Sequence, residues 1–402
     1  MNLKGKAVVG QSGGCTAVIN QSLIGVVDQA LKSKEITHVW GARHAVQGIL
    51  AGDFIDMARQ SKPVLKNVQN LPSAALGSSR YKMKEGEERK VIENFRKWNV
   101  RYFFMVGGND TAETILRIAR AAEEANYELR AIHIPKTIDN DLMETDHCPG
   151  YGSVARFVAV TTQEAGLDTR AMRHVDPVKI IEVMGRNSGW IVAASELLKK
   201  KELDPPHLLL FPEVPFDQNQ FLSNVENILT RVSYCIVVIS ETIRDEAGNR
   251  VGARKDGVMK DPFGHPYVEG ASTNLCRLVE EKFKIRARFD KPGTIQRMSI
   301  PYASEVDQVE AYQAGVHAVK WAVQGKSQVM VGFSRAKGNY KISYVPVPLE
   351  KIPGRERYIP ASFFNATKTG MSAAFHRYAL PLIGKKLPDF SGLKSIDAKT
   401  GD

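Results

Sequence analysis

Residues 131–141, Ala-Ile-His-Ile-Pro-Lys-Thr-Ile-Asp-Asn-Asp, join a short apolar run to a charged loop, and this junction indicates the fold. The run 131–134 predicts the end of a buried strand, and the loop that follows carries Lys136, Asp139 and Asp141. On extended backbone, side chains two residues apart point the same way, so both acids can face one cleft. Their like charges repel unless a metal ion, a lysine or a substrate hydroxyl relieves them. A polar loop that forms an Asx-turn and caps a helix is also compatible with the pattern.

The same order of strand, loop and helix recurs along the chain. Such alternation predicts an α/β fold, and there are more strands than one sheet comfortably holds. We therefore expect two doubly wound, Rossmann-like domains with the active site in the cleft between them. The predicted strands are 7–10, 38–42, 101–106, 131–134, 179–183, 207–211 and 234–239, and the longest predicted helices are 152–173 and 307–323.

Composition narrows the function class. The 402 residues carry a net charge of +11, which favours anionic ligands, but the basic residues are dispersed, so we expect no nucleic-acid partner. No apolar run reaches the roughly 18 residues that span a bilayer, and no signal peptide is evident. Cysteines 15, 148, 235 and 276 lie far apart, which indicates a reduced, cytoplasmic protein.

Two loops are candidates for binding phosphate. Gly13 and Gly14 follow the first strand and expose backbone N–H groups ahead of a helix, which suits an anion. The turn matches neither G-x-G-x-x-G nor a Walker A sequence, and a plain tight turn is the alternative. In the loop 77–82, Arg80 can bind phosphate bidentately, although a solvated surface loop would look the same.

Asp110 ends the run Gly107-Gly108-Asn109-Asp110 after a clear strand. It lies three residues before Glu113, which is the spacing of a capping box, so it is predicted to be a helix N-cap. A carboxylate there takes the place of a bound anion, so it would oppose one further phosphate. Two later strands also end in polar residues that suit an anionic or hydroxyl-rich ligand, namely Met184-Gly185-Arg186 and Glu241.

Together these motifs resemble the phosphofructokinase family. Six separated motifs occur in the family's order over residues 1 to about 325, and they most resemble its diphosphate-dependent branch. The motifs are Gly13-Gly14, Gly107-Gly108-Asn109-Asp110, residues 135–141, Met184-Gly185-Arg186, Glu241 and Gly293-Thr294-Ile295-Gln296-Arg297. The resemblance implies a glycolytic enzyme that reversibly transfers a phosphoryl group from diphosphate to the 1-hydroxyl of fructose 6-phosphate, with Mg²⁺ as cofactor.

The resemblance also implies a role for each residue. Asp139 would be the general base, with Lys136 and Asp110 as the other catalytic residues. Gly14 and Arg80 would bind the donor phosphates, and Asn109 and Asp141 would hold the metal. The implied fructose 6-phosphate contacts are Thr137, Ile138, Met184, Gly185, Arg186, Glu241, Arg288, Thr294 and Arg297. Arg288 would come from a neighbouring subunit, which implies a homodimer or homotetramer.

Two positions depart from the family pattern. Asn109 stands where most relatives have an aspartate that helps to hold magnesium, and an amide oxygen brings no charge. Thr294 replaces a tyrosine or histidine, and its hydroxyl has a shorter reach.

The charges at positions 110 and 136 bear on whether the phosphoryl donor is diphosphate or ATP. ATP-using members usually carry glycine where Asp110 stands, and commonly where Lys136 stands. Asp110 would repel the α-phosphate of ATP by about 4 kcal/mol per charge pair at 4 Å and an effective dielectric near 20. Lys136 would stabilise the transition state of diphosphate cleavage. We therefore expect a diphosphate donor. The alternatives are an ATP-dependent 6-phosphofructokinase, a Rossmann-type oxidoreductase and a non-catalytic regulator that binds sugar phosphates.

The family pattern also suggests a division of the chain. Residues 1–142 with roughly 270–325 would form the donor-binding domain. Residues 143–245 with roughly 326–390 would form the fructose 6-phosphate-binding domain. Residues 246–269 are expected to be an insertion or long loop, and 391–402 a C-terminal tail.

Overall fold

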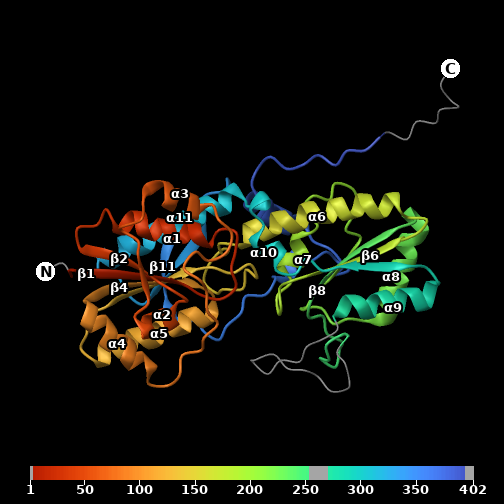
Figure 1. Cartoon of the computed structure of the whole chain (residues 1–402). Helices are drawn as coiled ribbons and strands as arrows, with labels where there is room; N and C mark the ends of the chain where they lie inside the picture. Colours follow the sequence, from red (N-terminus) through yellow and green to blue (C-terminus); the bar gives the residue numbers. More distant parts are fainter. Residues whose placement is uncertain (1–2, 253–269, 394–402) are drawn as a thin grey trace.

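The computed structural model describes residues 3–252 and 270–393. It contains two α/β domains side by side, each built on its own sheet with helices on both faces (Figure 1). Most of the expected insertion 246–269 and of the expected tail 391–402 lies outside the described residues.

The first sheet has seven strands in the order β11-β10-β5-β4-β1-β2-β3. Its pairs are parallel except at the two edges, where β10 pairs with β11 and β2 with β3 in antiparallel fashion. The strands are β1 (Gly5–Gln11), β2 (Ile36–Ala42), β3 (Phe54–Asp56), β4 (Val100–Gly107), β5 (Arg130–Pro135), β10 (Val329–Arg335) and β11 (Ile342–Pro348).

Helices cover both faces of this sheet. Successive side chains of a strand point to opposite faces, so Val8 of β1 packs into one core and Ala7 and Val9 into the other. Burial on both faces explains the near-continuous apolar runs of β1 and β4. One face carries α2 (Val46–Ala51), α4 (Glu87–Trp98) and α5 (Asn109–Glu124), and the other carries α1 (Ile19–Ala30), α3 (Lys62–Gln69) and α11 (Glu305–Val323).

The second sheet has four parallel strands in the order β7-β8-β6-β9. The strands are β6 (Val178–Val183), β7 (Leu208–Leu210), β8 (Cys235–Ser240) and β9 (Ala287–Asp290). In β6, Ile181 and Val183 pack toward α6 and α7, whereas Val178 and Ile180 face α8 and α9. The helices are α6 (Tyr151–Ala171), α7 (Trp190–Ala194), α8 (Gln218–Val232), α9 (Ala271–Phe283) and α10 (Ile295–Met298). No described helix is both long and apolar enough to cross a membrane.

After β11 the chain crosses from the first domain to the second. It forms short 3-10 turns (Leu349–Lys351, Ala361–Phe363 and Leu380–Ile383) and α12 (Ala373–Ala379). Ile359, Phe375 and Leu382 of this segment are buried in the core of the second domain. We call residues 349–386 the C-terminal segment.

The strand pairing differs from the expected division in two stretches. β9, expected with the first domain, pairs with β6 of the second sheet. β10 and β11, expected with the second domain, extend the first sheet beside β5. Parallel strands that are distant in sequence pair through backbone hydrogen bonds, and side-chain pattern alone does not identify the partner.

Candidate active site

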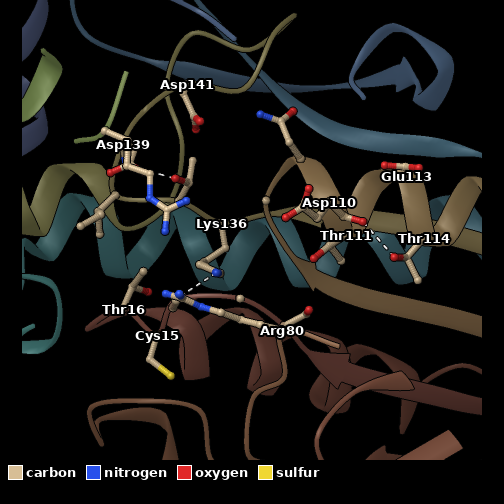
Figure 2. A pocket seen from close by; sticks show the side chains of 18 of the residues that line it. Cys15, Thr16, Arg80, Asp110, Thr111, Glu113, Thr114, Lys136, Asp139 and Asp141 are labelled. Atoms are coloured by element: carbon tan, nitrogen blue, oxygen red, sulfur yellow. Dashed lines mark hydrogen bonds between the residues drawn. The ribbon is translucent and has the colours of Figure 1, made fainter. Parts of the chain in front are cut away.

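A cleft of about 610 Å³ opens between the two domains, at the carboxyl ends of β1, β4, β5, β6 and β8. This is where open α/β sheets bind ligands, because the loops that leave parallel strands meet there. Figure 2 shows the side chains of Asp110, Lys136 and Asp139 around this opening.

Two cations meet at the glycine turn. The Lys136 ammonium group donates a 2.6 Å hydrogen bond to the carbonyl oxygen of Gly14. A Cβ atom on Gly14 would lie 2.8 Å from Nη1 of Arg297, so only glycine lets that guanidinium come so close. Nε of Arg297 is buried and has no hydrogen-bond partner among the described residues. An anion bound at this turn would therefore meet two positive charges and bare backbone.

Asp110 lies in the first turn of α5, on the cleft side, and is exposed. The prediction that it is the N-cap is wrong, because Gly108 occupies that position and no side chain caps the helix. The carboxylate is therefore not used by the backbone of α5. It faces the cleft and stays available to act on a bound ligand.

The loop after β5 is compact where extended backbone was expected. Asn140 has a φ of 55°, in the left-handed region, so Asp139 and Asp141 do not face the cleft through strand alternation. Asparagine tolerates this conformation better than most residues. Both acids nevertheless line the cleft. The amide of Asp139 donates to Oγ1 of Thr137 at 3.1 Å, and Ser188 donates its hydroxyl to the carbonyl of Asp139 at 3.0 Å.

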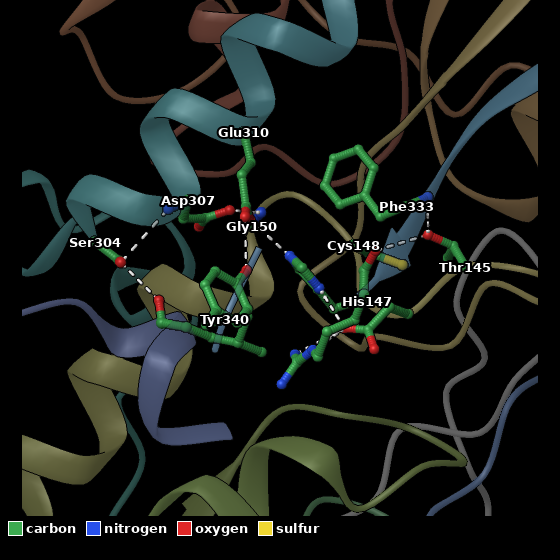
Figure 3. Close-up of polar contacts among 12 residues, drawn as sticks. Thr145, His147, Cys148, Gly150, Ser304, Asp307, Glu310, Phe333 and Tyr340 are labelled. Carbon is green, nitrogen blue, oxygen red and sulfur yellow. Dashed lines mark hydrogen bonds and ion pairs between the residues drawn. The ribbon is translucent and has the colours of Figure 1, made fainter. Parts of the chain in front are cut away.

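The rest of this loop is fixed by buried polar contacts (Figure 3). Thr145 bridges the loop to β10, because its hydroxyl donates to His147 and accepts from the amide of Phe333. His147 is bonded to Asp146 at 2.8 Å and to Glu310 of α11 at 2.7 Å. The loop that carries Asp139 is thus anchored to the first domain at its far end.

Three of the carboxylates that line the cleft have raised pKa values. Burial, followed by the charges of Asp141 and Glu241, raises the pKa of Asp139 to about 7. Burial also raises the pKa of Asp141, and the charge of Glu356 adds to that rise. Burial, with a smaller effect of Glu182, raises the pKa of Glu241. Carboxylates held this way attract a proton, a metal ion or a substrate hydroxyl.

Burial lowers the pKa of Lys136 to about 8, and the charge of Arg297 adds to this effect. Lys136 is only 3% exposed, so its ammonium group is desolvated. A bound polyanion would offset that cost.

Two observations bear on magnesium. Among residues 3–252 and 270–393, no group of three or more His, Cys, Asp and Glu side chains is arranged to hold a metal ion. However, the buried Oδ1 of Asn109 has no hydrogen-bond partner in the described chain, and Asp141 lines the same cleft. Mg²⁺ commonly binds one or two protein oxygens and completes its shell with water and substrate phosphates, so these residues fit it.

The structure brings together most of the sixteen predicted residues. The thirteen that line the cleft are Gly14, Arg80, Asn109, Asp110, Lys136, Thr137, Ile138, Asp139, Asp141, Met184, Arg186, Glu241 and Arg297. Gly185 does not line it, although its carbonyl accepts the hydroxyl of Ser240 at 3.2 Å. Thr294 is exposed ahead of α10, outside the cleft lining. Arg288 is also outside that lining and pairs with Asp176 at 2.8 Å.

Several cleft residues carried no recognised signal in the sequence. Glu356 comes from the C-terminal segment and accepts two 3.0 Å hydrogen bonds from Asn187. Ser188 holds the Asp139 carbonyl, as described above. Glu356 follows no strand and belongs to no motif, so nothing in the local sequence connects it to the cleft.

The chain is similar to known proteins over most of its length. The family model described as "Phosphofructokinase" matches residues 6–322. A Rhodospirillum rubrum protein named pyrophosphate–fructose 6-phosphate 1-phosphotransferase is 39% identical over 391 residues, which is 96% of each chain. A Halomonas elongata protein of the same name is 36% identical and covers 97% of this chain and 95% of its own. The crystal structure of a pyrophosphate-dependent phosphofructokinase from Nitrosospira multiformis superposes with a TM-score of 0.88 at 34% identity, covering 97% of this chain and 94% of that one.

Proposed function

The chain belongs to the phosphofructokinase family, and we propose that it transfers a phosphoryl group reversibly from diphosphate to the 1-hydroxyl of fructose 6-phosphate. The products would be fructose 1,6-bisphosphate and phosphate. The full-length relatives that carry the diphosphate-dependent name support this choice.

The observation that carries the proposal is the common location of Asp110 and Lys136. Both line the cleft that Gly14 and Asp139 also line, so both charges lie where a donor would bind. The negative charge of Asp110 opposes a third phosphate group and disfavours ATP. The positive charge of Lys136, already in contact with the glycine turn, favours the short donor.

Asp139 is proposed as the general base. A base works best when its pKa lies near the working pH, and the pKa of about 7 for Asp139 meets that condition. Its carboxylate would take the proton of the 1-hydroxyl as the oxygen attacks the terminal phosphorus of diphosphate. Lys136 would balance the charge that develops on the departing phosphate.

We propose that Asp141 and Asn109 hold Mg²⁺ together with the diphosphate oxygens. The ion would neutralise donor charge when bound. Asp141 supplies the negative oxygen, and Asn109 supplies the buried amide oxygen that has no other partner in the described chain.

The sugar phosphate would lie on the side of the second domain. Met184, Arg186 and Glu241 leave the ends of β6 and β8 there and line the cleft. Arg297, between this side and the glycine turn, would reach the 6-phosphate. Thr137 and Ile138 would complete the acceptor contacts. Gly185 would contribute through its backbone, and Thr294 is the weakest of the proposed contacts because it is exposed outside the cleft lining.

We further propose a homo-oligomer, a dimer or tetramer, in the cytoplasm. Arg288 is exposed on the edge strand β9, where it can reach a neighbouring subunit's cleft. All four cysteines are free, which suits a reducing compartment.

The test is a coupled assay of the purified protein with fructose 6-phosphate and Mg²⁺, comparing diphosphate, ATP and no donor. We expect turnover with diphosphate and little with ATP. Turnover with ATP and none with diphosphate would overturn the proposal.

A further inference from the structure

We propose that Arg357 is a positioning residue for the proposed reaction: it fixes the loop that carries Asp139 and Asp141. It lies in the C-terminal segment, beyond the residues 6–322 that the family model matches. The inference rests on the proposed function only in giving this loop its catalytic role.

Arg357 holds the loop through several hydrogen bonds at once. Its Nη2 and Nε donate to the carbonyl of Asn140 at 2.8 and 3.1 Å. Nη1 donates to the carbonyls of Thr145, at 2.9 Å, and Asp146. The backbone amide of Arg357 donates to the carbonyl of Asp141 at 2.8 Å. The fixed fork of a guanidinium suits such a set of carbonyls, and a lysine cannot reproduce it.

The same residue connects this loop to the second domain. The guanidinium lies 4.7 Å from the ring centre of Trp190, and the indole N–H donates to the carbonyl of Arg357 at 3.0 Å. Trp190 begins α7, directly after the loop that carries Met184 and Arg186. Arg357 therefore connects the loop that carries Asp139 and Asp141 to the loop that carries Met184 and Arg186.

Asn140, between the two acids, is the residue that this support fixes. Its backbone is left-handed, a conformation that asparagine tolerates better than most residues. Its side chain is fixed as well, because Oδ1 accepts from the amide of Cys148 at 3.0 Å and Nδ2 donates to the hydroxyl of Tyr378 at 3.0 Å. Tyr378, also from the C-terminal segment, donates to the carbonyl of Asp146 at 2.8 Å. Arg357 and Tyr378 thus both form hydrogen bonds with Asn140, which lies between Asp139 and Asp141.

The chain offers a matched control in Arg156. This arginine also donates to three backbone carbonyls, those of Ile383, Lys385 and Lys386, at 2.8 to 2.9 Å. It fastens the end of the C-terminal segment to α6 and, within the part of the chain that the structure describes, makes no hydrogen bond to residues 137–146. Loss of Arg156 should therefore affect stability in the same way without moving the loop.

The experiment compares Arg357→Gln, Arg357→Lys and Arg156→Gln in the full chain. We expect Arg357→Gln to lower kcat about 100-fold with KM values changed less than about threefold, because misplaced catalytic groups mainly affect the transition state. Arg357→Lys should recover a minor part of kcat, and Arg156→Gln should lower Tm similarly but keep kcat. Hydrogen exchange of the amides in 137–147 should accelerate only in the Arg357 variants.

The outcomes separate the two proposals. Equal kcat or equal loop exchange in Arg357→Gln and Arg156→Gln would overturn the positioning role. A wild-type protein without diphosphate-dependent turnover would overturn the proposed function, while hydrogen exchange would still test whether Arg357 fixes the loop. If Arg357→Gln does not fold, the variant Tyr378→Phe tests whether the C-terminal segment positions the loop. It removes one hydroxyl and should lower kcat about tenfold, whereas Tyr312→Phe, which loses a 2.9 Å hydrogen bond to Asp28 of α1, should not.

Discussion

Lys136 donates a 2.6 Å hydrogen bond to the carbonyl of Gly14, so a residue that follows β5 fixes the glycine turn that follows β1. The bond joins the turn that is proposed to bind the donor to the loop that holds the proposed base. It also explains how a buried ammonium group is tolerated, since a carbonyl dipole satisfies part of its hydrogen-bonding capacity before any donor binds.

We predict an alkaline limit on activity that is set by Lys136. Its pKa is lowered to about 8, so the ammonium form that favours diphosphate is full below that pH and is lost above it. The kcat/KM for diphosphate, which reports the free enzyme, should fall above pH about 8. In Lys136→Arg the positive charge persists above pH 8. Diphosphate ionises equally in both assays, so its effect cancels in the ratio of the wild-type kcat/KM to that of the variant. This ratio should fall over the same pH range. A ratio that is constant to pH 10 would contradict this assignment.

We predict that donor preference depends on the charges at 110 and 136. The double variant Asp110→Gly/Lys136→Gly should lose about 100-fold in kcat/KM for diphosphate and gain measurable turnover with ATP, because about 4 kcal/mol of repulsion is removed. Steady-state kinetics with both donors provides the measurement. Glu124→Gln removes another exposed carboxylate of α5, outside the cleft lining, and should change neither value. If the double variant still rejects ATP, pocket shape and not charge selects the donor.

Asp139→Asn should separate activity from stability. Without the base, kcat should fall by about 10² to 10⁴, as is typical when general-base catalysis is lost. At the same time the Tm of the ligand-free protein, measured in a chelator above pH 7, should rise, because the charge of Asp139 that Asp141 and Glu241 oppose is gone. Asp168→Asn, which removes an exposed carboxylate paired with Lys179, serves as the control and should show neither effect. A lower Tm in Asp139→Asn would show that Asp141 and Glu241 do not repel Asp139 as described.

His147 should stabilise the fold most at low pH. Its hydrogen bonds to Asp146 and Glu310 raise its pKa above 6.5 despite the opposing effect of burial. Its contribution to the free energy of unfolding is therefore fully present below about pH 6.5 and is lost as pH rises through the folded-state pKa. The charged and titratable neighbours Arg335 and Tyr340 keep those two acids in place. Chemical unfolding of His147→Gln should show a larger loss of stability at pH 6 than at pH 9.

His133 provides the opposite case. Burial lowers its pKa to about 4, so His133 contributes most above its unfolded pKa and loses that contribution as pH falls. The loss of stability in His133→Gln should accordingly be smaller at pH 5 than at pH 8. Identical pH dependence in the two variants would contradict both assignments.

The sequence predicted the features that depend on local pattern. Strands that are apolar on both sides and end in polar loops placed Gly14, Asp110, Asp139 and Glu241 at one edge of the fold, and that edge is the cleft. The fold class, two α/β domains, is confirmed. The roles of the individual residues stay predictions.

The features that were missed depend on contacts between distant segments. Spacing suggested that Asp110 caps α5, yet Gly108 takes that position, because a cap requires a particular backbone conformation as well as a suitable side chain. The contribution of Arg357 could not be predicted, since its donors reach backbone carbonyls, which every residue has. The partners of β9 and β10 were likewise fixed by hydrogen bonds that leave no mark on side-chain pattern.

The late position of the C-terminal segment has a consequence for biosynthesis. Asp139 and Asp141 leave the ribosome long before Arg357 and Tyr378, which fasten the loop between them. A nascent chain can therefore complete the first β-α units and still lack an ordered reaction centre. If Arg357 positions the loop as proposed, we expect chains that end before Arg357 to lack activity.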